Sequence, residues 1–206
     1  MLCNSYRIMK KSYLIIVVIA IAIIGWAVVK KQSKPGYTVP EGIARPSLGP
    51  EDAKVVLEEW GDYQCPACGA AHPIVKKVLS EFEGKIRFIP RHYPLSIHPY
   101  SFDAARSAEC ANDQSKFFQM HNTMYENQKN LTKTDLKRYA KDIGLDTEKF
   151  SQCLDSSAHK DFVYQEQRDG DKKGLQGTPT FYLNGQLVDN WTNLATLIQV
   201  ELDKTK

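Results

Sequence analysis

The part of the chain after residue 34 lacks an excess of positive charge. The first 34 residues carry six basic side chains and no acidic one, whereas residues 35–206 carry 21 basic and 24 acidic side chains. Proteins that bind nucleic acids normally present a basic patch or stripe to the phosphates. The composition therefore predicts a mildly acidic domain on a basic stem, and it argues against nucleic acid as a partner.

Cysteine is scarce, and the chain lacks a second closely spaced pair. Of the five cysteines, only Cys65 and Cys68 form a CxxC motif. Cys110 and Cys153 lie 42 and 85 residues beyond Cys68, and neither belongs to a CxxC or CxxH. A structural zinc site needs four ligands, which usually come as two close pairs. The missing second pair disfavours the interpretation of the CxxC motif as half of a zinc site.

One uncharged apolar run of 17 residues, at 13–29, lies between two lysine pairs. That length is the lower limit for a helix that crosses a bilayer, and it exceeds the core of most signal peptides. The run predicts a transmembrane anchor after a short N-terminal segment (1–12), with a cleaved signal peptide as the alternative. Residues 30–50 are rich in proline and glycine, which predicts a tether leading to a folded domain at 51–206.

The domain shows strand and helix signals that predict an α/β fold. Strands are expected at 53–60 and 85–93 with a helix at 66–82 between them, which is a βαβ unit and implies a mostly parallel sheet. Helices are expected next at 101–112, 115–127, 132–143, 147–154 and 158–173, the third and fourth opening with threonine caps. A type I′ hairpin at 180–188, turning at Asn184-Gly185, and a helix at 192–203 complete the domain.

The CxxC motif directly follows the first predicted strand. Pro66 suits the first position of a helix, so Cys65 is expected at the helix start and Cys68 one turn into it. The unpaired N–H groups and the dipole of that helix end stabilise a negative charge, which lowers the pKa of Cys65. A thiolate there is both a nucleophile and a good leaving group. This is the chemistry of thiol–disulfide exchange.

A second informative segment, Gly177-Thr178-Pro179-Thr180, precedes the apolar strand at 180–183. Proline cannot donate a hydrogen bond to a sheet, so Pro179 must begin the strand or lie on an edge. From these residues alone, the Thr178–Pro179 bond is expected to be trans, as most such bonds are.

Together, the two segments resemble the DsbA-type thiol:disulfide oxidoreductases of the thioredoxin superfamily. The resemblance covers residue 53 to the C-terminus and rests on EEWGDYQCPAC, RHYPLSIHPYSFDAARSAECA, QSKFFQMHNTMY and GTPTFYLNG, in the family's order. It implies a thioredoxin fold with an all-helical insertion at about 97–156, after the second strand. It also implies a cis Thr178–Pro179 bond against the CxxC, where the backbone of Thr178 can pair with a substrate peptide and Pro179 keeps metals out.

The resemblance also implies a role for each residue of the motif. Cys65 is expected to be the exposed sulfur that forms a mixed disulfide with the substrate, and the more buried Cys68 is expected to resolve it. Pro66 and Ala67 are expected to tune the thiolate. Many oxidases of this family carry histidine or tyrosine at the place of Ala67. Because alanine offers neither a hydrogen bond nor a charge, we expect a milder oxidant than the strongest members.

Three further features leave alternatives open. The resemblance implies that Glu59 lies beneath Cys68 and shuttles its proton; alternatively, strand alternation turns Glu59 or Glu58 to solvent. It also implies a second disulfide between Cys110 and Cys153, whereas the alternative is two buried free thiols. Surface or helix positions, rather than metal ligation, are expected for the histidines: His72, His92, His98, His121 and His159.

The leading functional prediction is a membrane-anchored, extracytoplasmic oxidoreductase that donates its Cys65–Cys68 disulfide to exported proteins. The partners implied are unfolded or reduced exported proteins and a membrane redox partner of the DsbB or vitamin K epoxide reductase-like kind. No organic cofactor or metal is implied, and a monomer is expected. The alternatives are a reductase or isomerase with the same fold, a copper(I) metallochaperone, and a binding module with a purely structural disulfide.

Overall fold

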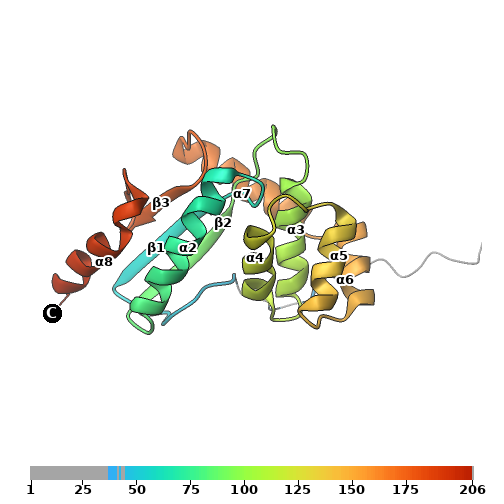
Figure 1. The fold of residues 1–206 in the computed structure, drawn as a ribbon, viewed down its shortest axis with the longest axis horizontal. Coiled ribbons are helices and arrows are strands. Elements are labelled where there is room, and N and C mark those ends of the chain that lie inside the picture. The colour runs from blue at the N-terminus through green and yellow to red at the C-terminus, as the bar shows by residue number, and fades with distance from the viewer. Residues whose placement is uncertain (1–36, 41, 43–44, 206) are drawn as a thin grey trace, which may run out of the picture. The chain divides into compact units, whose positions relative to one another are not determined.

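The computed structural model describes residues 37–40, 42 and 45–205 (Figure 1). The predicted anchor at 13–29, the segment before it and part of the predicted tether lie outside the described residues. Within the described ranges, no helix combines the length and apolar character that membrane crossing requires. Residues 37–206 form one compact unit.

A four-stranded sheet in the order β2-β1-β3-β4 forms one half of this unit. Strand β1 (Val55–Gly61) pairs in parallel with β2 (Ile86–His92). Strand β3 (Thr180–Leu183) runs antiparallel both to β1 and to β4 (Gln186–Leu187). The expectation of a mostly parallel sheet is therefore wrong. The crossover helix α2 makes only the two strands that it connects, β1 and β2, parallel.

Two helices cover one face of the sheet. They are α2 (Pro66–Glu81), which crosses in front of β1 and β2 in Figure 1, and α8 (Leu194–Asp203), which follows a 3₁₀ turn at Trp191–Asn193. Alternate residues of β1 point toward them, and Val55 and Leu57 are fully buried in the resulting core. The period of two along a strand dictates this pattern.

Helix α7 (Lys160–Lys173) packs against β2. Gly170 allows the close approach, because a Cβ at that position would lie 2.6 Å from the ring of Tyr93. The helix begins later than the predicted residue 158. His159 has a φ of 59°, in the left-handed region that interrupts a right-handed helix.

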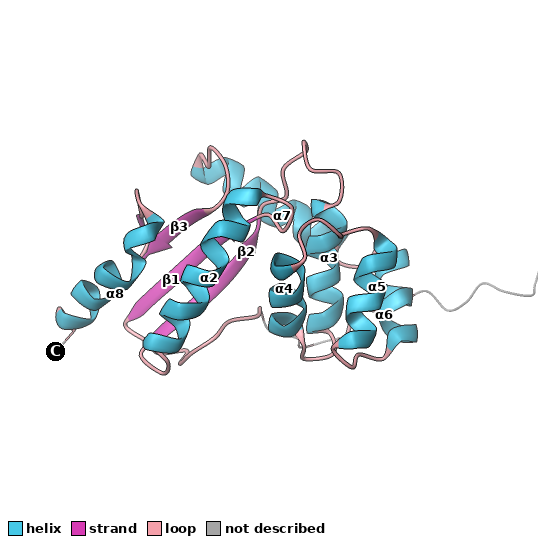
Figure 2. Cartoon of the chain, viewed as in Figure 1, coloured by secondary structure: helices cyan, strands magenta, loops and turns pink. Residues whose placement is uncertain are grey.

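Four helices form the predicted insertion between β2 and α7, and Figure 2 shows that it contains no strand. They are α3 (Ser101–Asn112), α4 (Phe117–Glu126), α5 (Lys133–Asp142) and α6 (Thr147–Asp155). Helix α4 starts two residues later than predicted because Ser115 has a φ of 58°. Thr132 caps α5 as predicted, but α6 is capped by Asp146 instead of Thr147.

The insertion contains a disulfide between Cys110 on α3 and Cys153 on α6, as the resemblance implied. Their Cα atoms are 5.8 Å apart, and both residues are fully buried. The alternative of two free thiols is therefore wrong.

The described segment before the sheet is fastened to the rest of the unit at three points. The Tyr37 hydroxyl donates to Asp113 over 2.6 Å, and Arg45 pairs with Glu166 on α7. Leu48 forms an antiparallel bridge with Phe88 at the outer edge of β2. Both Leu48–Phe88 backbone hydrogen bonds have ordinary lengths, 3.0 and 2.8 Å.

Candidate active site

Cys65 and Cys68 lie at the start of α2, as predicted. Cys65 is the N-cap residue with an extended backbone, and Pro66 occupies the first helical turn. Cys68 is fully buried one turn in, where its sulfur accepts a hydrogen bond from the Asp62 N–H over 3.5 Å. Both cysteines are free thiols, so the structure describes the reduced form of the pair.

The expected exposed sulfur of Cys65 is only slightly accessible. The residue is 7% exposed, compared with 0% for Cys68. Its thiol donates to the carbonyl oxygen of Thr178 over 3.3 Å, so the segment before β3 covers it. The Thr178–Pro179 bond is cis, as the resemblance implied, and the trans expectation from the residues alone is wrong.

The local environment moves the two thiol pKa values in opposite directions. The pKa of Cys65 falls to about 5, chiefly because the Cys68 thiol donates a hydrogen bond to it. Burial opposes this shift, whereas hydrogen bonds from the Thr178 side chain and from backbone N–H groups of the helix start lower the pKa further. The pKa of Cys68 is raised, first by burial and then by that same hydrogen bond. Cys65 is therefore a thiolate at neutral pH while Cys68 keeps its proton.

Glu59 points to the face of β1 that α2 covers. It is 2% exposed, and neither carboxylate oxygen has a hydrogen-bond partner among the described residues. Burial raises its pKa to about 8. The solvent-facing alternative is therefore wrong for Glu59, and its neighbour Glu58 is half-buried on the other face, where it pairs with Arg91.

A small cavity adjoins the Glu59 carboxylate. Its volume is about 10 Å³, and its walls include Glu59, Tyr63, His121 and Tyr125. A cavity of that size suffices for one water molecule when polar groups line it. The charge of Glu59 acts on the neighbouring Cys68 thiol and contributes to raising its pKa. The carboxyl group and the buried thiol are thus electrostatically coupled.

Sequence reasoning missed Asp62, which fixes the loop between β2 and α3 beside the CxxC. One carboxylate oxygen of Asp62 accepts from the Gln64 N–H over 2.7 Å. The other accepts from the Leu95 N–H at 2.8 Å and lies 2.7 Å from Nδ1 of His98. An aspartate just after a strand is a common turn signal, which gives a hint of this role but not of the distant partners.

Gln128, in the loop after α4, was also missed. Its side-chain amide donates to the carbonyl oxygens of Tyr63 and Cys65, over 2.9 and 2.8 Å. Gly69 leaves room for it, because a Cβ there would lie 1.9 Å from the amide oxygen of Gln128. The helical insertion thereby clamps the active-site turn. No local sequence pattern predicts this contact, because 63 residues separate Gln128 from Cys65.

Three of the five histidines are buried beside the site. His72 and His121 lie on helices, as expected, whereas the expectation of a surface or helix position is wrong for His92, which lies on β2. The rings of His72 and His121 have centroids 5.5 Å apart, and Nδ1 of His121 lies 3.0 Å from the Tyr63 hydroxyl. Burial lowers the pKa of His72 to about 4 and that of His121 well below its usual value. His92 is paired with Glu109 over 2.8 Å. These side chains fill the junction between the sheet and the insertion.

A family model described as Thioredoxin matches residues 42–200 of this chain. The chain belongs to the thioredoxin family. A thioredoxin-like oxidoreductase from Silicibacter pomeroyi DSS-3 is 27% identical with a TM-score of 0.68, and the match covers 78% of this chain and 91% of that one. BdbD from Bacillus subtilis, in its oxidised form, is 26% identical with a TM-score of 0.70, covering 77% and 93%.

A third solved relative narrows the class of this thioredoxin-family protein. The thiol-disulfide exchange protein alpha-DsbA2 from Wolbachia pipientis is 25% identical with a TM-score of 0.69, covering 79% of this chain and 87% of that one. Together with the fold and the CxxC geometry, these relatives make the chain a DsbA-like thiol:disulfide oxidoreductase with an inserted helical domain.

The thioredoxin-family chain also matches one part of larger proteins. It is 40% identical over 154 residues to the Na(+)/H(+) antiporter NhaA 1 of Mycobacterium sp. (strain KMS), and 38% identical over 139 residues to that of Salinispora arenicola (strain CNS-205). These matches cover 73% and 67% of this chain but only 25% and 21% of the antiporters. The chain thus spans about a quarter of the length of the curated relatives that it matches.

Proposed function

We propose that the protein is an extracytoplasmic oxidase, held at a membrane by residues 13–29, which donates its Cys65–Cys68 disulfide to reduced exported proteins. The observation that carries this proposal is the separation of the two thiol pKa values, lowered for Cys65 and raised for Cys68. A stable thiolate favours the reduced form, and a disulfide with a stabilised reduced form is a stronger oxidant.

The size of the shift supports a mild oxidant. The Cys65 pKa of about 5 lies between roughly 3.5 for DsbA and roughly 7 for thioredoxin. Ala67 contributes a backbone N–H to the Cys65 thiolate but no side-chain hydrogen bond or charge. This agrees with the expectation that alanine at this position gives a less extreme oxidant than histidine.

The first step of the proposed reaction opens the Cys65–Cys68 disulfide. A substrate thiolate attacks the Cys65 sulfur, a new S–S bond forms, and Cys68 leaves with the electron pair. Its raised pKa makes it take up a proton. Glu59, whose pKa of about 8 keeps it protonated at neutral pH, supplies that proton. The backbone at Thr178, beside the Cys65 sulfur, holds the substrate peptide.

The second step releases the oxidised substrate. The remaining substrate thiolate attacks the substrate sulfur of the mixed disulfide, and Cys65 leaves as the favoured thiolate. The substrate has then lost two electrons and two protons. The reduced Cys65–Cys68 pair returns to the disulfide by exchange with a membrane redox partner of the DsbB or vitamin K epoxide reductase-like kind, which accepts those electrons.

The geometry weighs against the two alternatives from other classes. Copper carriers with this fold generally need an added histidine or methionine ligand and a different cysteine spacing, and within the described residues no histidine joins Cys65 and Cys68 in a group of three metal ligands. A purely structural disulfide does not require a lowered thiol pKa or an unpartnered acid beneath it. A reductase or isomerase would have the same site, so the reduction potential of the Cys65–Cys68 pair must distinguish these alternatives from an oxidase.

The deciding measurement is the reduction potential of the Cys65–Cys68 pair in the full chain, equilibrated with glutathione and followed by alkylation at Cys65. Replacing both Cys110 and Cys153 by alanine isolates this couple. We expect a value between about −120 and −180 mV, the range of oxidases and isomerases. A value near −270 mV, as in thioredoxin, would sink the oxidase proposal in favour of the reductase.

The location is tested separately in cells. A maleimide that does not cross membranes is expected to label the Cys65 thiol of the reduced full chain in intact cells. Labelling only after lysis contradicts an extracytoplasmic domain.

A further inference from the structure

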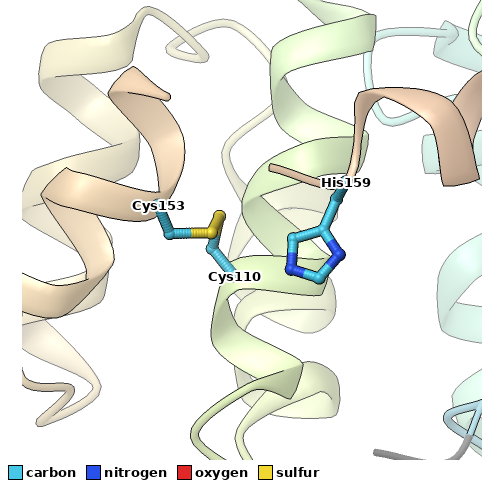
Figure 3. Close-up of side chains that lie close together, drawn as sticks. All are labelled: Cys110, Cys153 and His159. Carbon is cyan, nitrogen blue, oxygen red and sulfur yellow. A yellow bond between two sulfur atoms is a disulfide. The ribbon is translucent and has the colours of Figure 1, made fainter. Parts of the chain in front are cut away.

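Three side chains of metal-binding type lie close together at the helical insertion. Cys110, Cys153 and His159 each bring one ligand atom, and these atoms all lie within 4.8 Å of one another. Figure 3 shows the ring of His159 beside the disulfide. Two sulfurs and one imidazole nitrogen are typical zinc ligands, at about 2.3 and 2.0–2.1 Å from the ion. The disulfide cannot bind a metal in this way, but two thiols at the same place can.

Asp113 orients His159 toward such a role. Its carboxylate lies 2.7 Å from Nε2 of His159 and 3.8 Å from the Cys153 sulfur. The other carboxylate oxygen is buried and has no hydrogen-bond partner among the described residues. One and the same oxygen of Asp113, Oδ2, contacts Nε2 of His159 and the Cys153 sulfur, so this oxygen lies among the ligand atoms. That oxygen therefore offers Zn²⁺ a fourth ligand.

Contacts other than the disulfide also hold the loop that carries His159. Arg106 on α3 is 1% exposed and donates to the carbonyl oxygens of Ser156 and Ala158, over 2.7 and 3.0 Å. These bonds hold the loop between α6 and α7 that carries His159. The backbone of His159 is left-handed, with a φ of 59°, a conformation that costs free energy for a residue other than glycine.

An ion can reach this cluster through a cavity. The cavity has a volume of about 520 Å³ and opens beside the insertion. His159, Asp113, Tyr37 and Phe162 contribute to its walls. It therefore leads to the imidazole and the carboxylate, while the two cysteines behind them are fully buried. A metal site needs such a route from solvent.

We propose that reduction of the Cys110–Cys153 disulfide creates a Zn²⁺ site formed by Cys110, Cys153 and His159. A dithiol is oxidised to its own disulfide and gives up two electrons and two protons, so the Cys110–Cys153 S–S bond breaks and two thiols form; a phosphine does the same by taking oxygen from water, which supplies the two protons. Zn²⁺ then binds both sulfurs and releases both protons, without any change in its own oxidation state. The bound ion blocks reformation of the disulfide. This inference is independent of exchange at Cys65.

The test uses the full chain with Cys65→Ser and Cys68→Ser, so that only the second pair can bind a metal. The protein is reduced with a phosphine and titrated with Co²⁺, then with Zn²⁺ in competition. We expect one equivalent to bind, with the absorption bands of tetrahedral cobalt thiolate, and no binding before reduction. Asp113→Asn, which removes the charge of the fourth ligand, is expected to weaken binding at least about 10-fold, and His159→Ala to weaken it more.

A matched control is His98→Ala, which removes the histidine of another pair, 2.7 Å from Asp62. It is expected to leave the metal affinity unchanged. The proposal is wrong if the reduced chain binds no metal, or if His159→Ala binds as tightly as the parent, because the thiols alone would then be the site.

A second measurement covers the case in which reduction unfolds the chain. One equivalent of Zn²⁺ is then expected to restore the far-UV circular dichroism of the reduced parent but not that of reduced His159→Ala. Failure to restore the parent, or equal recovery in the variant, contradicts the proposal.

Discussion

The two cysteine pairs of this protein show how position decides what a sulfur does. Cys65 and Cys68 lie in one turn at a helix start, where hydrogen-bond donors converge and one thiol pKa falls to about 5. Cys110 and Cys153 lie on two different helices, 43 residues apart in the sequence, and form a fully buried disulfide. Both pairs belong to the same hydrophobic cluster, so burial alone does not distinguish them.

The difference lies in what surrounds the sulfurs. The first pair lies beside a carbonyl oxygen of Thr178 and a buried acid, and at neutral pH Cys65 is a thiolate while Cys68 keeps its proton. The second pair closes a long chain loop, which restricts the unfolded state. We expect the first pair to serve exchange and the second to serve stability, and the predictions below test this division and the surroundings of the first pair.

The largest expected effect is on exchange. Cys65→Ser removes the attacking and leaving sulfur, so we expect disulfide transfer to a reduced peptide to fall at least 10³-fold, on the order of the loss seen when other nucleophiles are removed. Alanine at both Cys110 and Cys153 is expected to keep the rate within about threefold at 25 °C, where only local packing changes. Comparable loss in both variants contradicts the division of roles.

Stability is expected to show the reverse. Without the Cys110–Cys153 disulfide, the unfolded chain regains the freedom of a loop closed over 43 residues, which lowers the free energy of unfolding by about 4 kcal/mol in the chain-entropy model. Urea unfolding of the double alanine variant measures this loss. The control is the parent with reduced Cys65 and Cys68, and an equal midpoint for the two proteins would refute the assignment.

Glu59→Gln is expected to stabilise the protein at neutral pH. The folded-state pKa of about 8 exceeds the ordinary 4.5, so the folded state binds the extra proton and stability falls as pH rises from about 4.5 to 8. At pH 7 this costs about 3 kcal/mol, which glutamine removes. Urea unfolding at pH 4.5 and pH 7 measures it.

Glu58→Gln, on the half-buried face of the same strand, is the control for that experiment. It is expected to lack the pH-dependent gain. If Glu59→Gln shows the same difference from the parent at both pH values, the acid is not the titrating group.

The smallest expected effect concerns Gln128, whose amide holds the active-site turn around Cys65. Gln128→Ala removes two hydrogen bonds to the carbonyl oxygens of Tyr63 and Cys65, and we expect a loss of about 2 kcal/mol in urea unfolding. Gly69→Ala is expected to displace the same amide. Both variants should raise the Cys65 pKa, measured by thiolate absorbance. Gln165→Ala, at an exposed site on α7, should change neither quantity.

Local signals predicted much of this fold because they rest on short-range physics. Pro66 after Cys65 placed the helix start, and Asn184-Gly185, with φ values of 49° and 79°, gave the hairpin turn. Helix starts were missed where a residue other than glycine takes a left-handed conformation, as at Ser115 and His159. Such conformations depend on tertiary packing and leave no mark in a local pattern.

The site was predictable only in part, for the same reason. The direction of the Cys65 pKa shift was predicted from the helix start, although its largest cause is the hydrogen bond from Cys68. The cis Thr178–Pro179 bond and the second disulfide came from resemblance and not from the residues. The contact between Gln128 and the active-site turn depends on how the insertion packs. Burial of His72 and His121 likewise depends on the junction between the insertion and the sheet.

The bridge between Leu48 and Phe88 has a consequence for how this protein behaves among unfolded chains. An open sheet edge offers unpaired N–H and C=O groups to any extended peptide nearby, and long exposed edges promote aggregation. Here Leu48 occupies part of the β2 edge, and the opposite edge strand, β4, is only two residues long. Under the proposed function, these edges limit the pairing of reduced client chains with the sheet and confine contact to the sulfur that reacts.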